Sequence, residues 1–182
     1  MSFLEKFEIK RYIFFLIFFL TIIFVAITFY LGLKFNPKYS TKNLTGNLIP
    51  NFTATTLMND NISFSNEDIN YNDYSLINIW ASWCKSCKDE HNILMDLSKV
   101  TGLNVYGINF KDNKKKAIHY LKNFGNPYTT IGVDNDGSLS INLGAYGVPE
   151  SILIDKNKKI VSKYIGPLNE VHYKEILIEI QK

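Results

Sequence analysis

The feature that most constrains this chain is its only pair of cysteines, Cys84 and Cys87, which are separated by two residues. They follow the short apolar run at residues 75–80, which has the length of a buried strand, and precede a segment with apolar residues at helical spacing. A Cys-x-x-Cys motif that leaves a strand and opens a helix places its sulfurs one helical turn apart, close enough for a disulfide. Unpaired N–H groups and the helix dipole favour the thiolate of the first cysteine, which is the form that attacks disulfides. The motif therefore predicts a redox-active dithiol.

Three other uses of two cysteines fit the sequence less well. A structural zinc site needs four ligands, and the histidines at positions 91, 119 and 172 are scattered, with no second pair at ligand spacing. Covalent haem attachment needs a histidine directly after the second cysteine, where this chain has Lys88. A purely structural disulfide across two residues would restrain the unfolded chain only weakly. We therefore expect no bound metal and no cofactor other than the Cys84–Cys87 dithiol itself.

Residues 12–33 are uncharged and mostly apolar, and they are rich in Phe, Ile and Leu. A helix of this length spans the roughly 30 Å hydrocarbon core of a bilayer. The run is longer than the apolar part of a cleaved signal peptide, no small-x-small cleavage pattern follows it, and it has no polar face to suit a core helix. We therefore expect an N-terminal segment at residues 1–11, an uncleaved transmembrane anchor at residues 12–33, a polar linker at residues 34–48 and one folded domain at residues 49–182.

Charge alone does not orient this anchor, because three cations precede it (Lys6, Lys10 and Arg11) and three follow it (Lys34, Lys38 and Lys42). A membrane-tethered dithiol is most useful in an oxidising compartment, where thiols are not otherwise kept reduced. We therefore expect residues 1–11 to be cytoplasmic and the catalytic domain to lie outside the cytoplasm.

The remaining charges give little indication of a partner. The net charge of +3 is small and the charges are interspersed, so nothing suggests a nucleic-acid partner. The basic run at residues 111–116 is interpreted as the solvated start of a helix, and a docking patch for an acidic partner is the weaker alternative.

The pattern of residues 49–182 predicts one mixed α/β domain. Strands are expected at residues 75–80, 103–109 and 129–133 and in a hairpin at residues 150–155 and 159–165, and helices at residues 84–99, 114–124 and 169–181. The first strands should be parallel and joined by a right-handed crossover, whereas the hairpin adds antiparallel strands. A mixed sheet flanked by helices on both faces follows. A dithiol at the end of the first central strand is the thioredoxin arrangement, so the expected fold is thioredoxin-like.

A second motif, Tyr-Gly-Val-Pro-Glu at residues 146–150, stands directly before the expected hairpin. A proline after a glycine at the start of a strand is a candidate cis-proline, although a trans proline in a tight turn fits the local sequence equally well. In thioredoxin folds such a proline lies beside the dithiol and helps to hold an extended substrate. The dithiol upstream therefore favours a cis bond before Pro149.

Several segments of the domain together resemble one family. They are Leu-Ile-Asn-Ile-Trp-Ala-Ser-Trp-Cys-x-x-Cys-Lys-Asp-Glu-His at residues 76–91, Gly-Ile-Asn-Phe-Lys-Asp at 107–112, Lys-Ala-Ile-His-Tyr-Leu at 116–121, Gly-Asn-Pro-Tyr at 125–128, and Gly-Ala-Tyr-Gly-Val-Pro-Glu-Ser-Ile-Leu-Ile-Asp at 144–155. They resemble the CcmG/DsbE family, which comprises membrane-anchored, thioredoxin-like thiol:disulfide interchange proteins of cytochrome c maturation. The Gly-Asn-Pro-Tyr and Tyr-Gly-x-Pro-Glu elements separate this group from generic thioredoxins. The resemblance runs from about residue 49 to the C-terminus.

The resemblance implies a role for each matching residue around the dithiol. Cys84 would be the exposed nucleophile and Cys87 the thiol that resolves the mixed disulfide. Trp83 would flank the site, and Pro149 would be the cis-proline. One departure is the pair between the cysteines, Lys-Ser at residues 85–86, where the family usually has Pro-Thr; a lysine beside Cys84 should favour its thiolate.

The resemblance also implies two acidic residues near the dithiol, Glu90 and Glu150. Asn78 stands where thioredoxin itself has a buried aspartate. Because an amide cannot take up a proton from Cys87, Glu90 or Glu150 is the expected base. The alternative is that each is only a surface charge or a helix-start carboxylate.

The function that the resemblance implies is that of a reductase. The dithiol would open the disulfide of an apocytochrome c or of a partner maturation protein, and a transmembrane thiol reductant would restore it. The residues alone predict only dithiol–disulfide exchange. Two alternatives are an anchored thioredoxin-like reductase of other envelope proteins and a copper metallochaperone, whose cysteines are usually spaced three apart rather than two.

Overall fold

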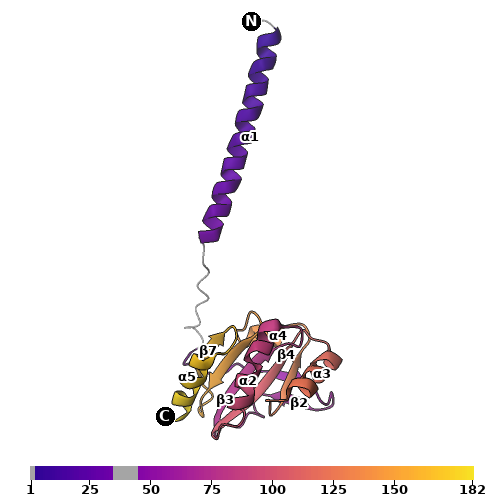
Figure 1. The fold of residues 1–182 in the computed structure, drawn as a ribbon, viewed down its shortest axis with the longest axis vertical. Coiled ribbons are helices and arrows are strands. Elements are labelled where there is room, and N and C mark those ends of the chain that lie inside the picture. Colours follow the sequence, from indigo (N-terminus) through magenta and orange to yellow (C-terminus); the bar gives the residue numbers. More distant parts are fainter. Residues whose placement is uncertain (1–2, 35–44) are drawn as a thin grey trace. The chain divides into compact units, whose positions relative to one another are not determined.

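The computed structural model describes residues 3–34 and 45–182, and the chain forms two units, residues 1–40 and 41–182 (Figure 1). The first unit contains one helix, α1, at Phe3–Lys34. Its segment Lys10–Gly32, 23 residues, is long and apolar enough to cross a membrane, and the expected anchor at residues 12–33 falls almost entirely within it. Most of the expected linker, at residues 34–48, lies outside the described residues.

The second unit is built on a five-stranded mixed sheet in the order β5-β4-β3-β6-β7. The strands are β3 at Tyr74–Trp80, β4 at Leu103–Phe110, β5 at Ile131–Asp134, β6 at Glu150–Ile154 and β7 at Ile160–Ile165. β3, β4 and β5 run parallel, whereas β6 and β7 are antiparallel to their neighbours. The expected mixed sheet with a C-terminal hairpin is therefore confirmed, and β3 lies at its centre.

Helices cover both faces of this sheet, as expected. On one face, α2 (Lys85–Leu97), α3 (Lys114–Phe124) and α5 (Glu170–Ile180) contribute Leu94, Leu121 and Ile176 to a shared core with β3. On the other face, a second core joins the sheet to Phe64 and Leu143. Phe64 belongs to a small antiparallel hairpin of β1 (Thr53–Thr55) and β2 (Ser63–Ser65), and Leu143 follows the short helix α4 (Ser138–Asn142).

The side chains of β3 alternate between these two cores. Leu76 and Trp80 belong to the core under α2, whereas Ile77 and Ile79 belong to the opposite core. Because successive strand residues point to opposite faces, Asn78 points to the same side as Leu76 and Trp80. A fully buried amide is thereby directed beneath the helix that carries the dithiol.

Local capping explains where the flanking helices begin and end. Asn113 caps α3 by accepting a hydrogen bond from the backbone N–H of Lys116. Gly125 ends the same helix at φ 96°, a conformation that disfavours a side chain, as the sequence predicts for a glycine stop. The sequence did not predict α4 or the β1–β2 hairpin, because elements of three to five residues leave no usable periodicity.

Candidate active site

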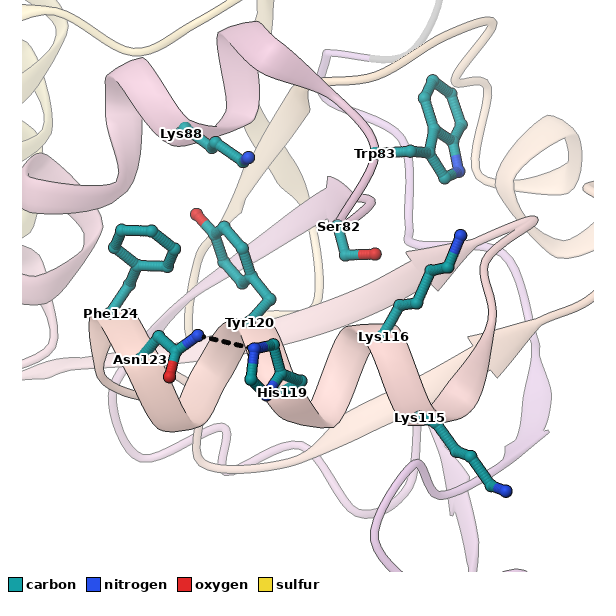
Figure 2. Close-up of a pocket in the computed structure, with 9 residues that line it drawn as sticks. All are labelled: Ser82, Trp83, Lys88, Lys115, Lys116, His119, Tyr120, Asn123 and Phe124. Carbon is teal, nitrogen blue, oxygen red and sulfur yellow. Dashed lines mark hydrogen bonds between the residues drawn. The ribbon is translucent and has the colours of Figure 1, made fainter.

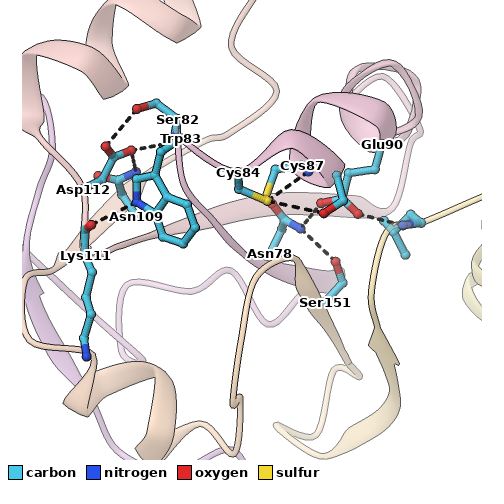
Figure 3. Close-up of a disulfide and its surroundings, with 12 residues drawn as sticks. Asn78, Ser82, Trp83, Cys84, Cys87, Glu90, Asn109, Lys111, Asp112 and Ser151 are labelled. Carbon is cyan, nitrogen blue, oxygen red and sulfur yellow. Dashed lines mark hydrogen bonds between the residues drawn. A yellow bond between two sulfur atoms is a disulfide. The ribbon is translucent and has the colours of Figure 1, made fainter.

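The dithiol lies at the start of α2, directly after β3 and a short turn. Cys84 is the N-cap of the helix, and its Sγ accepts a hydrogen bond from the backbone N–H of Cys87 at 3.1 Å. The two residues form a disulfide, with their Cα atoms 5.3 Å apart (Figure 3). N-caps are usually oxygen-bearing side chains that satisfy an unpaired helix N–H, and a sulfur takes that place here. Once the disulfide opens, the same N–H group and helix dipole favour a thiolate at Cys84.

Both cysteines are buried in this oxidised form. Cys84 is 5% exposed and Cys87 3% exposed, so the expectation of an exposed Cys84 is not met. The physical reason is the capping geometry, which turns Cys84 Sγ onto the helix N-terminus and bonds it to Cys87. The hydroxyl of Ser86 lies 3.7 Å from Cys84 Sγ and is a second polar neighbour of that sulfur.

The turn before the dithiol is tied to the loop between β4 and α3. Asp112 accepts hydrogen bonds from the backbone N–H and the hydroxyl of Ser82, the latter at 2.8 Å. Trp83 donates from Nε1 to the carbonyl oxygen of Lys111 at 3.0 Å, while its side chain remains largely exposed (Figure 3). Trp83 therefore flanks the site, as expected, in an orientation set by two segments about 30 residues apart in sequence.

Glu90 is the acidic residue that the structure brings beneath the dithiol. It lies one helical turn after Cys87 on α2, and both side chains are buried. Its Oε1 accepts a hydrogen bond from Asn78 Nδ2 at 2.8 Å, and its Oε2 accepts one from the backbone N–H of Leu168 at 2.7 Å. Burial raises the pKa of Glu90 to about 7, and the two hydrogen bonds only partly oppose that rise. A carboxyl group with this pKa can both accept and return a proton near neutral pH.

Asn78 is the centre of a buried hydrogen-bond network around Glu90. Its Oδ1 accepts from the hydroxyl of Tyr128 at 2.8 Å, and its Nδ2 donates to the hydroxyl oxygen of Ser151 at 3.0 Å as well as to Glu90. Ser151 lies opposite Asn78 in the β3–β6 pairing, on the same face of the sheet (Figure 3). Burial, followed by the charge of Glu90, raises the pKa of Tyr128 well above its usual value, so its hydroxyl stays a donor.

The second motif forms the loop that leads into β6. The bond between Val148 and Pro149 is cis, as expected. Glu150 pairs with Ile79 in the sheet, so Pro149 lies at the edge where β3 ends and the chain turns toward the dithiol. Val148 packs against the core that contains both cysteines. The structure therefore brings the loop and the dithiol to the same end of the sheet.

Glu150 has different partners from those expected of a base for Cys87. Along β6, Ser151 and Leu153 share the face of Asn78, so Glu150 and Ile152 point to the opposite face of the sheet. There Glu150 Oε2 forms a buried ion pair with Lys163 Nζ at 2.7 Å. This alternation separates Glu150 from the side of the sheet that carries Cys87 and leaves Glu90 as the nearby carboxylate.

The Glu150–Lys163 pair supports the cis-proline loop instead. Oε1 of Glu150 accepts hydrogen bonds from the backbone N–H groups of Tyr146 and Gly147, at 2.8 and 3.0 Å. Lys163 Nζ donates to the carbonyl oxygen of Gly144 in the same loop. Both charged side chains are buried, and together they bind both ends of the loop to the sheet.

Several residues of the site were given no role in the sequence analysis. Ser151 could have been found by pairing the expected strands, because it lies opposite Asn78. Tyr128 and Asp112 end two of the segments that carry the family resemblance, but nothing local indicates their roles, and Lys163 gave no signal, because their partners are distant in sequence. In the part of the chain that the structure describes, no group of three or more His, Cys, Asp or Glu side chains could hold a metal ion.

Comparison with known proteins agrees with this geometry. The redoxin family model matches residues 44–177. A thiol:disulfide interchange protein DsbE of Pseudomonas fluorescens biotype C is 37% identical over 153 residues, which cover 84% of each chain. The DsbE of Escherichia coli (strain K12) is 40% identical over 126 residues, 69% of this chain and 68% of that protein.

A solved structure supports the fold. The crystal structure of a Chlorobium tepidum protein, described there as a DsbE candidate, superposes with a TM-score of 0.63 over 75% of this chain and 95% of that one, at 22% identity. This structural similarity supports the thioredoxin-like fold, whereas the similarity in sequence to the two DsbE proteins supports the activity. A dithiol that caps a helix at the end of a central strand is suited to thiol:disulfide interchange, the reaction for which these relatives are named. The chain therefore belongs to the redoxin family and, within it, to the DsbE (CcmG) thiol:disulfide interchange proteins, which are dithiol–disulfide oxidoreductases.

Proposed function

We propose that this protein is a membrane-anchored reductant that opens disulfides of apocytochrome c, or of a partner maturation protein, on the periplasmic side of a bacterial inner membrane. Membership of the DsbE family supports the reaction class. The resemblance of the dithiol and cis-proline motifs to cytochrome c maturation proteins supports the substrate. The apolar segment Lys10–Gly32 supports a single-pass anchor.

The reaction transfers two electrons from the dithiol to the substrate disulfide. The Cys84 thiolate attacks one substrate sulfur, so a mixed disulfide forms and the other substrate sulfur leaves as a thiolate. Cys87 then loses its proton and attacks Cys84 Sγ, which releases the second substrate thiolate and leaves the Cys84–Cys87 disulfide. The substrate gains both electrons, and a dithiol reductant outside this chain must restore the protein.

Buried Glu90, one turn from Cys87, is the structural observation that carries the proposed dithiol–disulfide exchange. The resolving step requires Cys87, a thiol that is only 3% exposed, to give up a proton. A carboxylate with a pKa of about 7 on the same helix face can accept that proton at neutral pH. Asn78 and the N–H of Leu168 hold the carboxylate in place during the transfer.

The experiment uses the reduced full-length protein in nonionic detergent. Its substrate is a peptide that carries a disulfide within a Cys-x-x-Cys-His sequence, and the control peptide has the same composition and loop size but lacks the histidine after the second cysteine. We expect faster reduction of the Cys-x-x-Cys-His peptide. Equal rates would contradict the cytochrome-specific proposal and favour a general envelope reductase.

Capture of the natural partner provides a second test. In the Cys87→Ser variant the mixed disulfide at Cys84 cannot be resolved, so the substrate stays attached. We expect the captured proteins to include an apocytochrome c or a maturation factor. Capture of unrelated envelope proteins alone would support the general reductase instead.

A C-terminal alkaline phosphatase fusion tests the proposed orientation. Because this phosphatase is active only outside the cytoplasm, we expect the fusion to be active, and an inactive fusion would contradict the proposed orientation.

A further inference from the structure

We propose that a basic groove beside the dithiol binds an acidic segment of the disulfide-bearing partner protein. The groove has a volume of about 550 Å³ and lies between α2 and α3 (Figure 2). We call it the α2–α3 groove; it is lined by Ser82, Trp83, Lys88, Lys115, Lys116, His119, Tyr120, Asn123 and Phe124. The inference rests on the proposed function, because it concerns how that substrate docks.

The position of the groove relates it to the redox reaction. Ser82 and Trp83 form one wall, and they are the two residues directly before Cys84. Asp112 holds that turn against the β4–α3 loop, so the wall is rigidly tied to the start of α3. A chain joined to Cys84 through a mixed disulfide therefore has the groove immediately beside its point of attachment.

The charge of the groove selects an anionic occupant. Lys88 of α2 and Lys115 and Lys116 of α3 line it, and no Asp or Glu does. All three lysine side chains are exposed, and none forms an ion pair with another described residue, whereas nearby Lys114 is paired with Asp60. Figure 2 shows Lys88 reaching from α2 toward Tyr120 and Lys116 reaching toward Trp83. Lys88 and Lys116, unpaired cations on two different helices, thus face one hollow, which favours carboxylate groups.

The walls of the groove also offer apolar contact. Trp83 and Phe124 are 57% and 55% exposed, although both are large aromatic side chains, and Tyr120 closes the floor between them. Tyr120 is fixed by ring contacts with Trp80 and His91. Exposed aromatic residues beside cations suit a short peptide in which Asp or Glu alternates with an apolar residue. A segment of a partner protein fits these walls better than a small anion does.

The test compares two disulfide peptides of equal length, one flanked by Asp and Glu and one by Asn and Gln. The reduced full-length protein in nonionic detergent should reduce the acidic peptide about three to ten times faster at low ionic strength, and added salt should remove the difference. The Lys88→Glu/Lys116→Glu variant should lose or reverse this preference. The preference is measured as the ratio of its rates on the two peptides, so a change in dithiol reactivity that affects both peptides cancels.

The matched control is Lys156→Glu/Lys159→Glu, which makes the same charge change on exposed residues between β6 and β7 and should keep the preference. Equal rates for the two peptides with the unsubstituted protein would overturn the inference alone. The inference would also be overturned if Lys88→Glu/Lys116→Glu still reduced the acidic peptide faster than the neutral one. Failure to reduce either peptide would overturn the proposed function and this inference with it.

Discussion

Asn78 Nδ2 donates a hydrogen bond to Glu90 Oε1 over 2.8 Å, and this contact joins the central strand to the helix that carries the dithiol. The hydroxyl of Tyr128 fixes the amide by donating to its oxygen, so the nitrogen must face the carboxylate. Where thioredoxin has a buried acid on the strand, this chain has an amide on the strand and its acid on the helix. The buried carboxyl group thereby lies on the same element as Cys87.

Glu90→Gln should slow resolution of the mixed disulfide by about tenfold or more near pH 7, because a general base has been removed. Attack by Cys84 should be nearly unchanged. The attack rate is measured in a Cys87→Ser background and the resolution rate with Cys87 present. Asp89→Asn is the matched control, since it removes an exposed carboxylate from the same helix. Unchanged resolution in Glu90→Gln would end the proton-transfer role.

The stability of the oxidised protein should depend on the protonation of Glu90. Its folded-state pKa of about 7 lies above the ordinary value of 4.5, so the unfolded chain loses this proton first as the pH rises. The free energy of unfolding should therefore fall between about pH 4.5 and 7, by up to ~3 kcal/mol. Chemical denaturation at several pH values measures this slope. Glu90→Gln should flatten it, and an identical slope in both proteins would contradict the raised pKa.

Asn78→Asp should raise the apparent pKa of the site further. It places a second carboxyl group at hydrogen-bond distance from Glu90, and two neighbouring carboxylates resist ionising together. The pH profile of mixed-disulfide resolution should then move to higher pH. Tyr128→Phe serves as the comparison, because it removes only the hydroxyl that orients Asn78 and should cost about 1 kcal/mol of stability. If the pH profile of resolution is the same in Asn78→Asp as in the unsubstituted protein, residue 78 does not influence the pKa of Glu90.

Removing one partner of the Glu150–Lys163 pair should destabilise the protein by about 3–5 kcal/mol, because the other charge stays buried. The double variant Glu150→Gln/Lys163→Met should lose less than the sum of the two single variants. Denaturant unfolding of all four proteins measures the coupling. The exposed pair Asp96–Lys99 is the control, and Asp96→Asn should cost no more than about 1 kcal/mol. Additive losses at Glu150 and Lys163 would show that the pair does not hold the loop.

Cys84 should react with a small alkylating reagent faster than Cys87 between pH 5 and 8. Both are buried in the disulfide, so the difference should arise in the reduced protein from the helix N-terminus at Cys84. Mass spectrometry of briefly alkylated protein gives the two rates. The Cys84→Ser and Cys87→Ser variants report each thiol alone. Equal rates would remove the assignment of Cys84 as the nucleophile and Cys87 as the resolving thiol. Faster alkylation of Cys87 would reverse that assignment.

Local patterns predicted most of the elements that hold the site. The apolar run before Cys84 predicted β3, the spacing after it predicted α2, and the predicted bounds of α3 match those observed. These elements depend on residues that are neighbours along the chain, where the period of a strand or helix acts directly. The cis bond before Pro149 did not follow from neighbours alone, because the local motif fits cis and trans equally well and only the dithiol upstream favoured cis.

The amino-acid sequence by itself therefore determined the dithiol, its position between a strand and a helix, and the apolar N-terminal segment. Only the tertiary structure decided which carboxylate lies on the same side of the sheet as Cys87, because strand alternation directs Asn78 and Ser151 to the face of α2 and directs Glu150 to the other face. It also brought Lys88 into one groove with the lysines of α3, which the sequence alone presented as a solvated helix start. Such contacts join distant segments, and they form only when packing against the central sheet sets the faces and register of its strands and helices.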